Sequence, residues 1–146
     1  MTRLEELEDY AHKNDIEIIV TAAESRFKGC CMVLDGDAAV TLNVAKIRDT
    51  ADRLCVLAEE VGHIQTDALL DCEEYLSPRF SKWLKVKHEI QAKRWAIAEL
   101  LPPEKIQSAI NERRDLSEHL GVTDEFLVEA IKYYNRQGIE FASPDL

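Results

Sequence analysis

The stretch from about residue 49 to residue 66 constrains the fold of this chain most, because its apolar residues recur at intervals of three and four. This spacing places them along one face of an α-helix, so the stretch is predicted to form a core-facing helix. Asp49 or Thr50 can cap its first turn. The other elements are therefore placed relative to this helix. Its apolar positions are Ala51, Leu54, Cys55, Ala58, Val61 and Gly62.

The second half of this helix carries several potential metal ligands and a potential base. Glu59 and His63 lie four residues apart and share one helix face, while Glu60 is rotated by about 100° beside that face. The zinc-protease pattern HExxH uses the same spacing: two imidazoles bind Zn²⁺, and the intervening glutamate accepts a proton from the metal-bound water. Here Glu59 takes the place of the first histidine. The arrangement can hold a cation.

Gly62 lies inside the same helix, next to His63. A glycine in a helix interior is less stable than alanine by roughly 1 kcal/mol. Its presence therefore predicts that another element of the fold approaches this turn closely.

Three strands are predicted before this helix, at Ile16 to Thr21, Gly29 to Leu34 and Ala38 to Leu42. Asp35-Gly36-Asp37 is a hairpin turn signal, so the last two strands are expected to be antiparallel. A helix capped by Thr2 and ending near Asn14 precedes them. An exposed edge of this sheet can accept an extended peptide.

The chain after the central helix is predicted to be helical. Residues 67–78 form a polar loop, and Ser77 or Ser81 then opens a long helix that carries Glu89 and is stopped by Pro102-Pro103. Shorter helices follow at about 104–111 and 115–120, and a last one capped by Thr123 extends to about residue 137. The predicted class is α+β, in a single domain of residues 1–146, with the sheet and long helices in 1–101 and a helical part in 102–146.

Composition limits the partners and the location of the chain. The 28 acidic and 18 basic residues give a formal charge of -10, which repels phosphate backbones and argues against direct nucleic-acid binding. A protein partner is expected. No signal peptide and no run of roughly 20 apolar residues is present, so we expect a cytoplasmic protein without membrane contact. The cysteines contain no CxxC pair and are expected to be reduced and structural.

Two longer motifs resemble one protein family. Residues 53–63 read RLCVLAEEVGH, after VTLN at residues 40–43, and residues 89–96 read EIQAKRWA, followed by ELLP at residues 99–102. The first motif is similar to LAHELGH of the ImmA/IrrE zinc metallopeptidases, whose members are common in phages and integrative elements. The second is similar to the E-x-x-A-x-x-[FW]-A and ELLMP segments of that family. The resemblance covers most of the chain.

This resemblance implies a zincin fold in which Glu59, His63 and Glu89 bind Zn²⁺ and Glu60 is the catalytic base. A carboxylate binds Zn²⁺ at about 2.0–2.2 Å, so Glu59 is a possible ligand. Two carboxylates and one imidazole leave the bound site formally neutral, and slower hydrolysis is therefore expected than in an HExxH relative. The harder ligands also shift the preference toward Mn²⁺ or Fe²⁺, although the general affinity order favours Zn²⁺.

The function that follows from the resemblance is a metal-dependent endopeptidase. It would cleave the repressor of a phage or mobile element, a helix-turn-helix protein, and so control the genes that the repressor silences. The alternative is a catalytically degenerate protein that binds a repressor or another regulatory protein without cleaving it. A third interpretation has no site at all, with Glu59, Glu60 and His63 on a solvated helix face. His88 is interpreted as a surface residue, because it diverges from Glu89 by about 100°.

Overall fold

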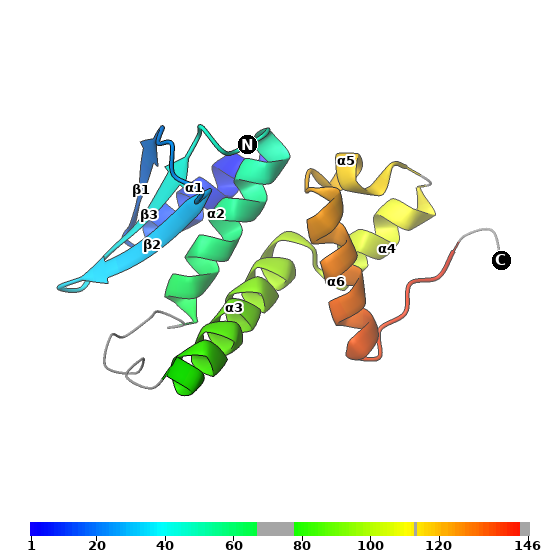
Figure 1. Ribbon diagram of the computed structural model, residues 1–146. Helices are drawn as coiled ribbons and strands as arrows, with labels where there is room; N and C mark the ends of the chain where they lie inside the picture. The colour runs from blue at the N-terminus through cyan, green and yellow to red at the C-terminus, as the bar shows by residue number, and fades with distance from the viewer. Residues whose placement is uncertain (67–77, 113, 144–146) are drawn as a thin grey trace.

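The computed structural model describes residues 1–66, 78–112 and 114–143 of the chain, with the side chains of residues 34 and 78–84 left aside. The fold is α+β, as the sequence predicts: a small three-stranded sheet lies to one side of a group of helices (Figure 1). The loop predicted for residues 67–78 falls almost entirely outside the described residues.

The first element is helix α1 (Arg3–Lys13), which begins and ends where its sequence predicts. The Thr2 side chain accepts a hydrogen bond from the backbone N–H of Glu5, and the Glu5 side chain accepts one from the backbone N–H of Thr2. This reciprocal capping box satisfies two donors that the helix itself leaves unpaired. Asn14 forms the C-cap.

The sheet is formed by β1 (Ile16–Thr21), β2 (Gly29–Leu34) and β3 (Asp37–Asn43), in the order β1-β3-β2. Strands β2 and β3 are antiparallel, which confirms the hairpin prediction, and Gly36 in the turn has a φ of 84°. Strand β1 pairs with β3 in the parallel direction. The sheet is therefore mixed, and β2 forms one of its edges.

Helix α2 (Thr50–Gln65) covers the inner face of the sheet, and the Asp49 side chain caps it by accepting a hydrogen bond from the N–H of Asp52. Figure 1 shows α2 between the sheet and the helices that follow α2 in the chain. Its apolar stripe is the centre of the core, as predicted, because it packs between the strands and the next helix. The fully buried side chains around it include Leu7, Val40, Leu42, Leu57, Val61 and Ile97.

Helix α3 (Pro78–Leu100) packs along α2 in the opposite direction, and Gly62 is the point of closest approach. A Cβ atom at Gly62 would lie only 2.6 Å from the carbonyl oxygen of Ala92. The close approach predicted from this glycine is thus confirmed: only a residue without a side chain lets the two helices come this near.

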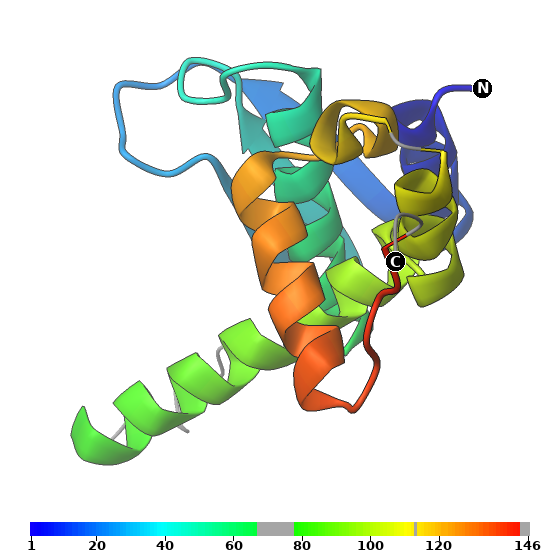
Figure 2. The ribbon, with the colours of Figure 1, turned by 90° about the vertical axis from the view of Figure 1, so that its right-hand side faces the viewer.

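The C-terminal part consists of α4 (Pro103–Asn111), α5 (Leu116–Leu120) and α6 (Asp124–Arg136). Gly121 ends α5 with a φ of 71°, and Thr123 caps α6 by accepting a hydrogen bond from the N–H of Phe126. The hydroxyl of Tyr134 donates to the carbonyl oxygen of Leu101 at 2.7 Å, which ties α6 to the end of α3. In the turned view α6 crosses in front of α2, and the first half of α3 extends beyond it (Figure 2).

Within the described residues, no helix combines the length and the apolar character that a membrane span needs.

Candidate functional site

Helices α2 and α3 face each other with charged residues at the same spacing on both. On α2 the residues are Glu59 and His63, and on α3 they are Glu89 and Lys93, each pair four residues apart and hence on one helix face. Because the helices run in opposite directions, Glu59 meets Lys93 and His63 meets Glu89. The Lys93 Nζ lies 2.6 Å from the Glu59 Oε1, and the His63 Nε2 lies 3.5 Å from the Glu89 Oε1. We call these two contacts the interhelix pairs.

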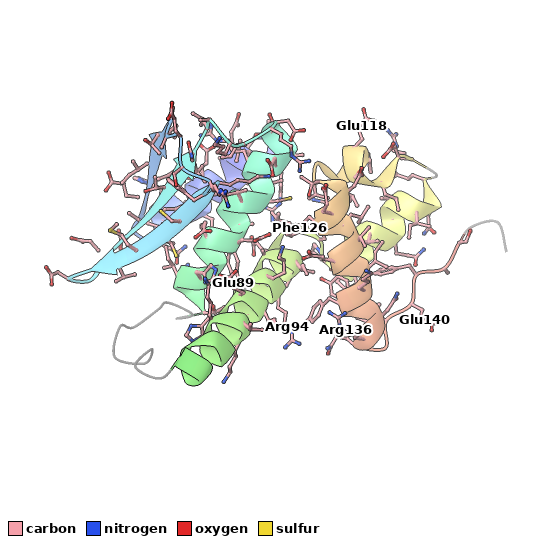
Figure 3. The ribbon with its side chains drawn as sticks, in the orientation of Figure 1. Glu89, Arg94, Glu118, Phe126, Arg136 and Glu140 are labelled. Carbon is pink, nitrogen blue, oxygen red and sulfur yellow. The ribbon has the colours of Figure 1, made fainter. Side chains whose placement is uncertain are left out.

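The pair of Glu59 and Lys93 also contacts a third helix, α6. The ammonium of Lys93 also lies 2.9 Å from Glu129 of α6, and it stands 5.7 Å from the centre of the Phe126 ring. Figure 3 shows Phe126 on the side of α6 that faces α3. Burial opposes the charge on Lys93, but the two carboxylates outweigh it and raise the pKa of Lys93 above its usual value. Lys93 therefore stays a cation that joins α2 to α6.

The pair formed by His63 opens onto a groove beside the edge strand. This groove has a volume of about 380 Å³, and β2, α2 and α3 all contribute to its lining. The His63 side chain is 13% exposed, whereas the Glu89 side chain is 58% exposed. Its lining includes Cys31, Met32, Glu60, His63, His88 and Glu89. We call this space the β2 groove.

Glu89 and His88 differ in exposure. Glu89 stands next to the apolar Ile90 in the sequence, but its side chain is mostly exposed, so no buried, unpaired carboxylate calls for a metal ion here. His88 is half-buried and lines the β2 groove together with Glu89. Figure 3 labels Glu89 on the flank of α3 next to α2.

Glu60, the predicted base, lies between α2 and β2. Gly29 leaves room for it, since a Cβ atom there would come within 2.7 Å of Val56 and 3.2 Å of the Glu60 Cγ. The thiol of Cys31 lies beside the Glu60 carboxylate. Burial, with the charge of Glu60 beside it, raises the pKa of Cys31 to about 12, so this thiol stays protonated and is not a nucleophile.

Burial also raises the pKa of Glu60 above its usual value; the carboxylates of Glu59 and Glu89 add to this shift, while His63 and Cys31 oppose it. A carboxylate whose pKa is raised by burial holds a proton more readily near neutral pH, which suits a group that exchanges protons. The role of Glu60 as a base stays a prediction.

The three predicted metal ligands line two adjoining cavities. His63 and Glu89 line the β2 groove, whereas Glu59 lines a cavity of about 510 Å³ next to α6 and is paired with Lys93. Gly29 and Glu60 line both cavities. In the part of the chain that the structure describes, no group of three or more His, Cys, Asp or Glu side chains is arranged to hold a metal ion. Glu59 is paired with the ammonium of Lys93, and Glu59, His63 and Glu89 as Zn²⁺ ligands stay a prediction.

Lys93 is the residue that sequence reasoning missed. Within EIQAKRWA it occupies a position that the resemblance leaves unspecified, so the resemblance implies no role for it. A signal was nevertheless present, because Lys93 follows Glu89 by four residues just as His63 follows Glu59. Two such pairs on antiparallel helices place a cation opposite Glu59.

Two further polar residues have structural roles that the motifs do not reveal. Asn43, at the end of β3, is fully buried and bonds to the backbone of Ala23 and Phe27, which holds the connection between β1 and β2. Asp52, which is 4% exposed, pairs with Lys28 at 3.0 Å and with Arg48 at 3.4 Å. Burial opposes its ionisation, but the hydrogen bonds from Arg48 and Lys28 hold the pKa of Asp52 below its usual value.

Comparisons with protein-family models, with curated proteins and with solved structures give no match to this chain. Over the residues that the structure describes, the class is an α+β protein with a small mixed sheet and six helices. The resemblance to ImmA/IrrE metallopeptidases therefore rests on the motifs in residues 40–43, 53–63 and 89–102.

Proposed function

We propose that this chain binds an extended segment of a regulatory protein in the β2 groove and holds it without hydrolysing it. The resemblance suggests the partner: a helix-turn-helix repressor of a phage or mobile element. The observation that carries the proposal is the 2.6 Å contact between Lys93 and Glu59, at the position that the family pattern gives to the first metal ligand.

The absence of hydrolysis follows from what Lys93 does to that position. An ammonium compensates the charge of Glu59 as a metal would, but it has no open coordination site at which water could be activated. Lys93 and Glu59 are only 30% and 29% exposed, and Glu129 shares the same ammonium. Moving Lys93 away would leave partly buried charges without partners, which opposes its exchange for a metal ion.

Binding of an extended segment is supported by the position of β2. This strand pairs with β3 on one side and forms the edge of the sheet on the other. The edge of a strand offers backbone N–H and C=O groups to an added strand, and the side chains beside it select the sequence. Met32 and Val33, which are 58% and 45% exposed, lie along the β2 groove and offer apolar contacts.

A second candidate is the metal-dependent endopeptidase, which one specific observation favours. His63, Glu89 and the predicted base Glu60 line the same groove, and the first two are 3.5 Å apart. With Glu59 as third ligand, Zn²⁺ or Mn²⁺ held there would acidify a bound water. Glu60 would take up that proton, and β2 would align the substrate. This candidate requires Lys93 to leave Glu59.

One experiment separates the two candidates. The purified protein is mixed with purified helix-turn-helix repressors, with added Zn²⁺, with Mn²⁺ or with a chelator. Binding is measured by titration calorimetry, and cleavage by mass spectrometry. Binding in the presence of chelator, with the repressor intact under all conditions, supports the non-hydrolytic protein. Cleavage that the chelator, Glu60→Gln and His63→Ala each abolish would establish the endopeptidase instead.

The site of binding is tested by a matched pair of variants. Met32→Glu places a charge on the exposed edge strand and should weaken repressor binding at least tenfold. Ile19→Glu places the same charge on β1, at the opposite edge of the sheet, where the side chain is 42% exposed. It should leave binding unchanged. Equal losses in both variants would show that the partner does not use the β2 groove.

A further inference from the structure

A second groove lies between α3 and α6, and Glu89 lies at the border between it and the β2 groove. It has a volume of about 280 Å³. Ile90, Ile97 and Tyr133 provide its apolar lining, and Arg94, Lys132 and Arg136 provide basic groups. Figure 3 labels Arg94 on the side of α3 toward α6, and Arg136 near the lower end of α6. We call it the α3–α6 groove.

The groove continues along an uncovered face of α3. Val86, Ile90, Arg94 and Ile97 follow one another at intervals of four, four and three residues, so they lie on one helix face. Val86 and Ile90 are 52% and 46% exposed. In Figure 2 the first half of α3 projects past the end of α6, so α6 covers only the later part of this face. A helix that exposes an apolar stripe of this kind normally buries it against another helix.

The charge of the groove is opposite to that of the chain as a whole. The chain carries 28 acidic and 18 basic residues. The groove, in contrast, is lined by four basic residues and two acidic ones. One of the four, Lys93, is engaged with Glu59 and Glu129. The guanidinium of Arg94 lies 5.4 Å from the centre of the Tyr133 ring, which holds it at the wall of the groove. Lys87 adds a further basic group next to Val86 and Ile90.

We propose that an acidic amphipathic helix of a partner protein docks in the α3–α6 groove. Its apolar face covers Val86, Ile90 and Tyr133, and its carboxylates pair with Arg94, Lys132 and Arg136. Two helices form the walls, and a third helix laid between them buries apolar side chains in the way that helix-in-groove recognition does. Arginine is suited to carboxylates because its planar fork donates two parallel hydrogen bonds. This proposal does not depend on what the β2 groove binds.

The test uses a synthetic peptide of about 18 residues, long enough to form a helix in water, with leucine along one helix face and glutamate on the other. Fluorescence anisotropy measures its binding to the full chain at low and at physiological salt. We expect saturable 1:1 binding that weakens as salt increases. A peptide of the same composition in scrambled order should bind at least tenfold more weakly, and a peptide with lysine in place of glutamate should not bind.

Variants of the chain locate the binding. Lys132→Glu and Arg136→Glu change exposed residues of α6 and should each weaken peptide binding at least fivefold, and Ile90→Ser should do so without altering charge. Lys46→Glu makes the same charge change at an exposed position between β3 and α2 and should have no effect. Circular dichroism confirms that each variant is folded.

Three outcomes would overturn the proposal. The first is equal binding of the ordered and the scrambled peptide, because the groove would then attract charge alone. The second is equal loss of binding in Lys46→Glu and Lys132→Glu. The third is absence of peptide binding together with Lys132-dependent binding of vesicles rich in phosphatidylserine, which would identify the surface as a contact for anionic lipid.

Discussion

The two interhelix pairs are alike in sequence spacing and differ in their surroundings. The pair of Glu59 and Lys93 is covered by α6, and both side chains are about 30% exposed. The pair of His63 and Glu89 opens onto the β2 groove, and Glu89 is 58% exposed. The comparison shows that the two charged positions of α2 have different surroundings: Glu59 contacts α3 and, through Lys93, α6, while His63 lies beside a groove.

The largest expected effect is a loss of both interhelix pairs at once. Gly62→Ala places a methyl group 2.6 Å from the carbonyl oxygen of Ala92 and forces α2 and α3 apart. We expect the free energy of unfolding to fall by about 2 to 3 kcal/mol, which urea denaturation measures. A stability equal to or above that of the natural chain would mean that the helices are not held this closely.

The next effect separates the two pairs. Lys93→Met leaves the carboxylates of Glu59 and Glu129 without their shared cation. Because these groups are partly exposed, we expect a loss of about 1 to 2 kcal/mol, less than for a fully buried pair. Combining it with Glu59→Gln should cost less than the sum of the two single changes.

Lys13→Met is the matched control, because Lys13 pairs with Asp9 at 2.8 Å on an exposed helix surface. It should not change stability measurably. Equal losses in Lys93→Met and Lys13→Met would mean that the contact between Glu59 and Lys93 contributes no more to stability than a surface ion pair.

Metal addition tests whether Lys93 prevents Glu59 from binding an ion. If Lys93 keeps Glu59 from acting as a ligand, then Zn²⁺ should raise the Tm of Lys93→Met by about 3 °C through ligand linkage and leave the Tm of the natural chain unchanged. Differential scanning fluorimetry with and without chelator measures both. His63→Ala in the Lys93→Met background should remove the increase. An increase in the natural chain would show that Lys93 does not exclude the ion.

The pH dependence of stability reports on Glu60. Its pKa is raised in the folded protein by burial, from a usual value of 4.5, so the folded state binds more protons than the unfolded state just above that pH. The contribution of Glu60 to the free energy of unfolding is then fully present below about pH 4.5 and is lost as the pH rises through the folded-state pKa. Glu60→Gln should flatten this decline in urea titrations at successive pH values. Glu17→Gln, at an exposed position of β1, should leave it as it is.

The smallest expected change in stability concerns the pair of His63 and Glu89. Glu89→Gln removes a contact at 3.5 Å from a side chain that is 58% exposed, and we expect a change of about 0.5 kcal/mol or less. Thermal unfolding measures it beside Lys93→Met. A loss as large as that of Lys93→Met would mean that both pairs carry equal weight in the fold.

Much of the fold could be predicted because the signals are local. Thr2, Asp49 and Thr123 each cap the helix that their position predicts. The turn at Gly36 joins two antiparallel strands, as predicted. Such features depend on a few neighbouring residues, whose hydrogen bonds and dihedral angles are determined by side-chain type. The parallel pairing of β1 with β3 is not local, and no residue pattern in the chain indicated it.

The candidate site was predictable only in part. The i, i+4 spacing correctly places Glu59 and His63 on one face of α2, and Gly62 correctly indicates the close approach of a second helix. What the spacing does not contain is the identity of the group opposite each residue. The exposure of Glu89 could not be inferred either, since the apolar residues around it in sequence point to other faces of α3.

The sequence by itself determined which stretches form helices and strands, the caps of several helices, and which side chains share a face. Short-range hydrogen bonding and hydrophobic periodicity are enough for that. The tertiary structure alone decided that Glu59 meets an ammonium and that Glu60 and His63 meet a groove. Those contacts depend on the direction in which α3 packs on α2 and on the placement of α6, and packing of this kind arises from the whole core.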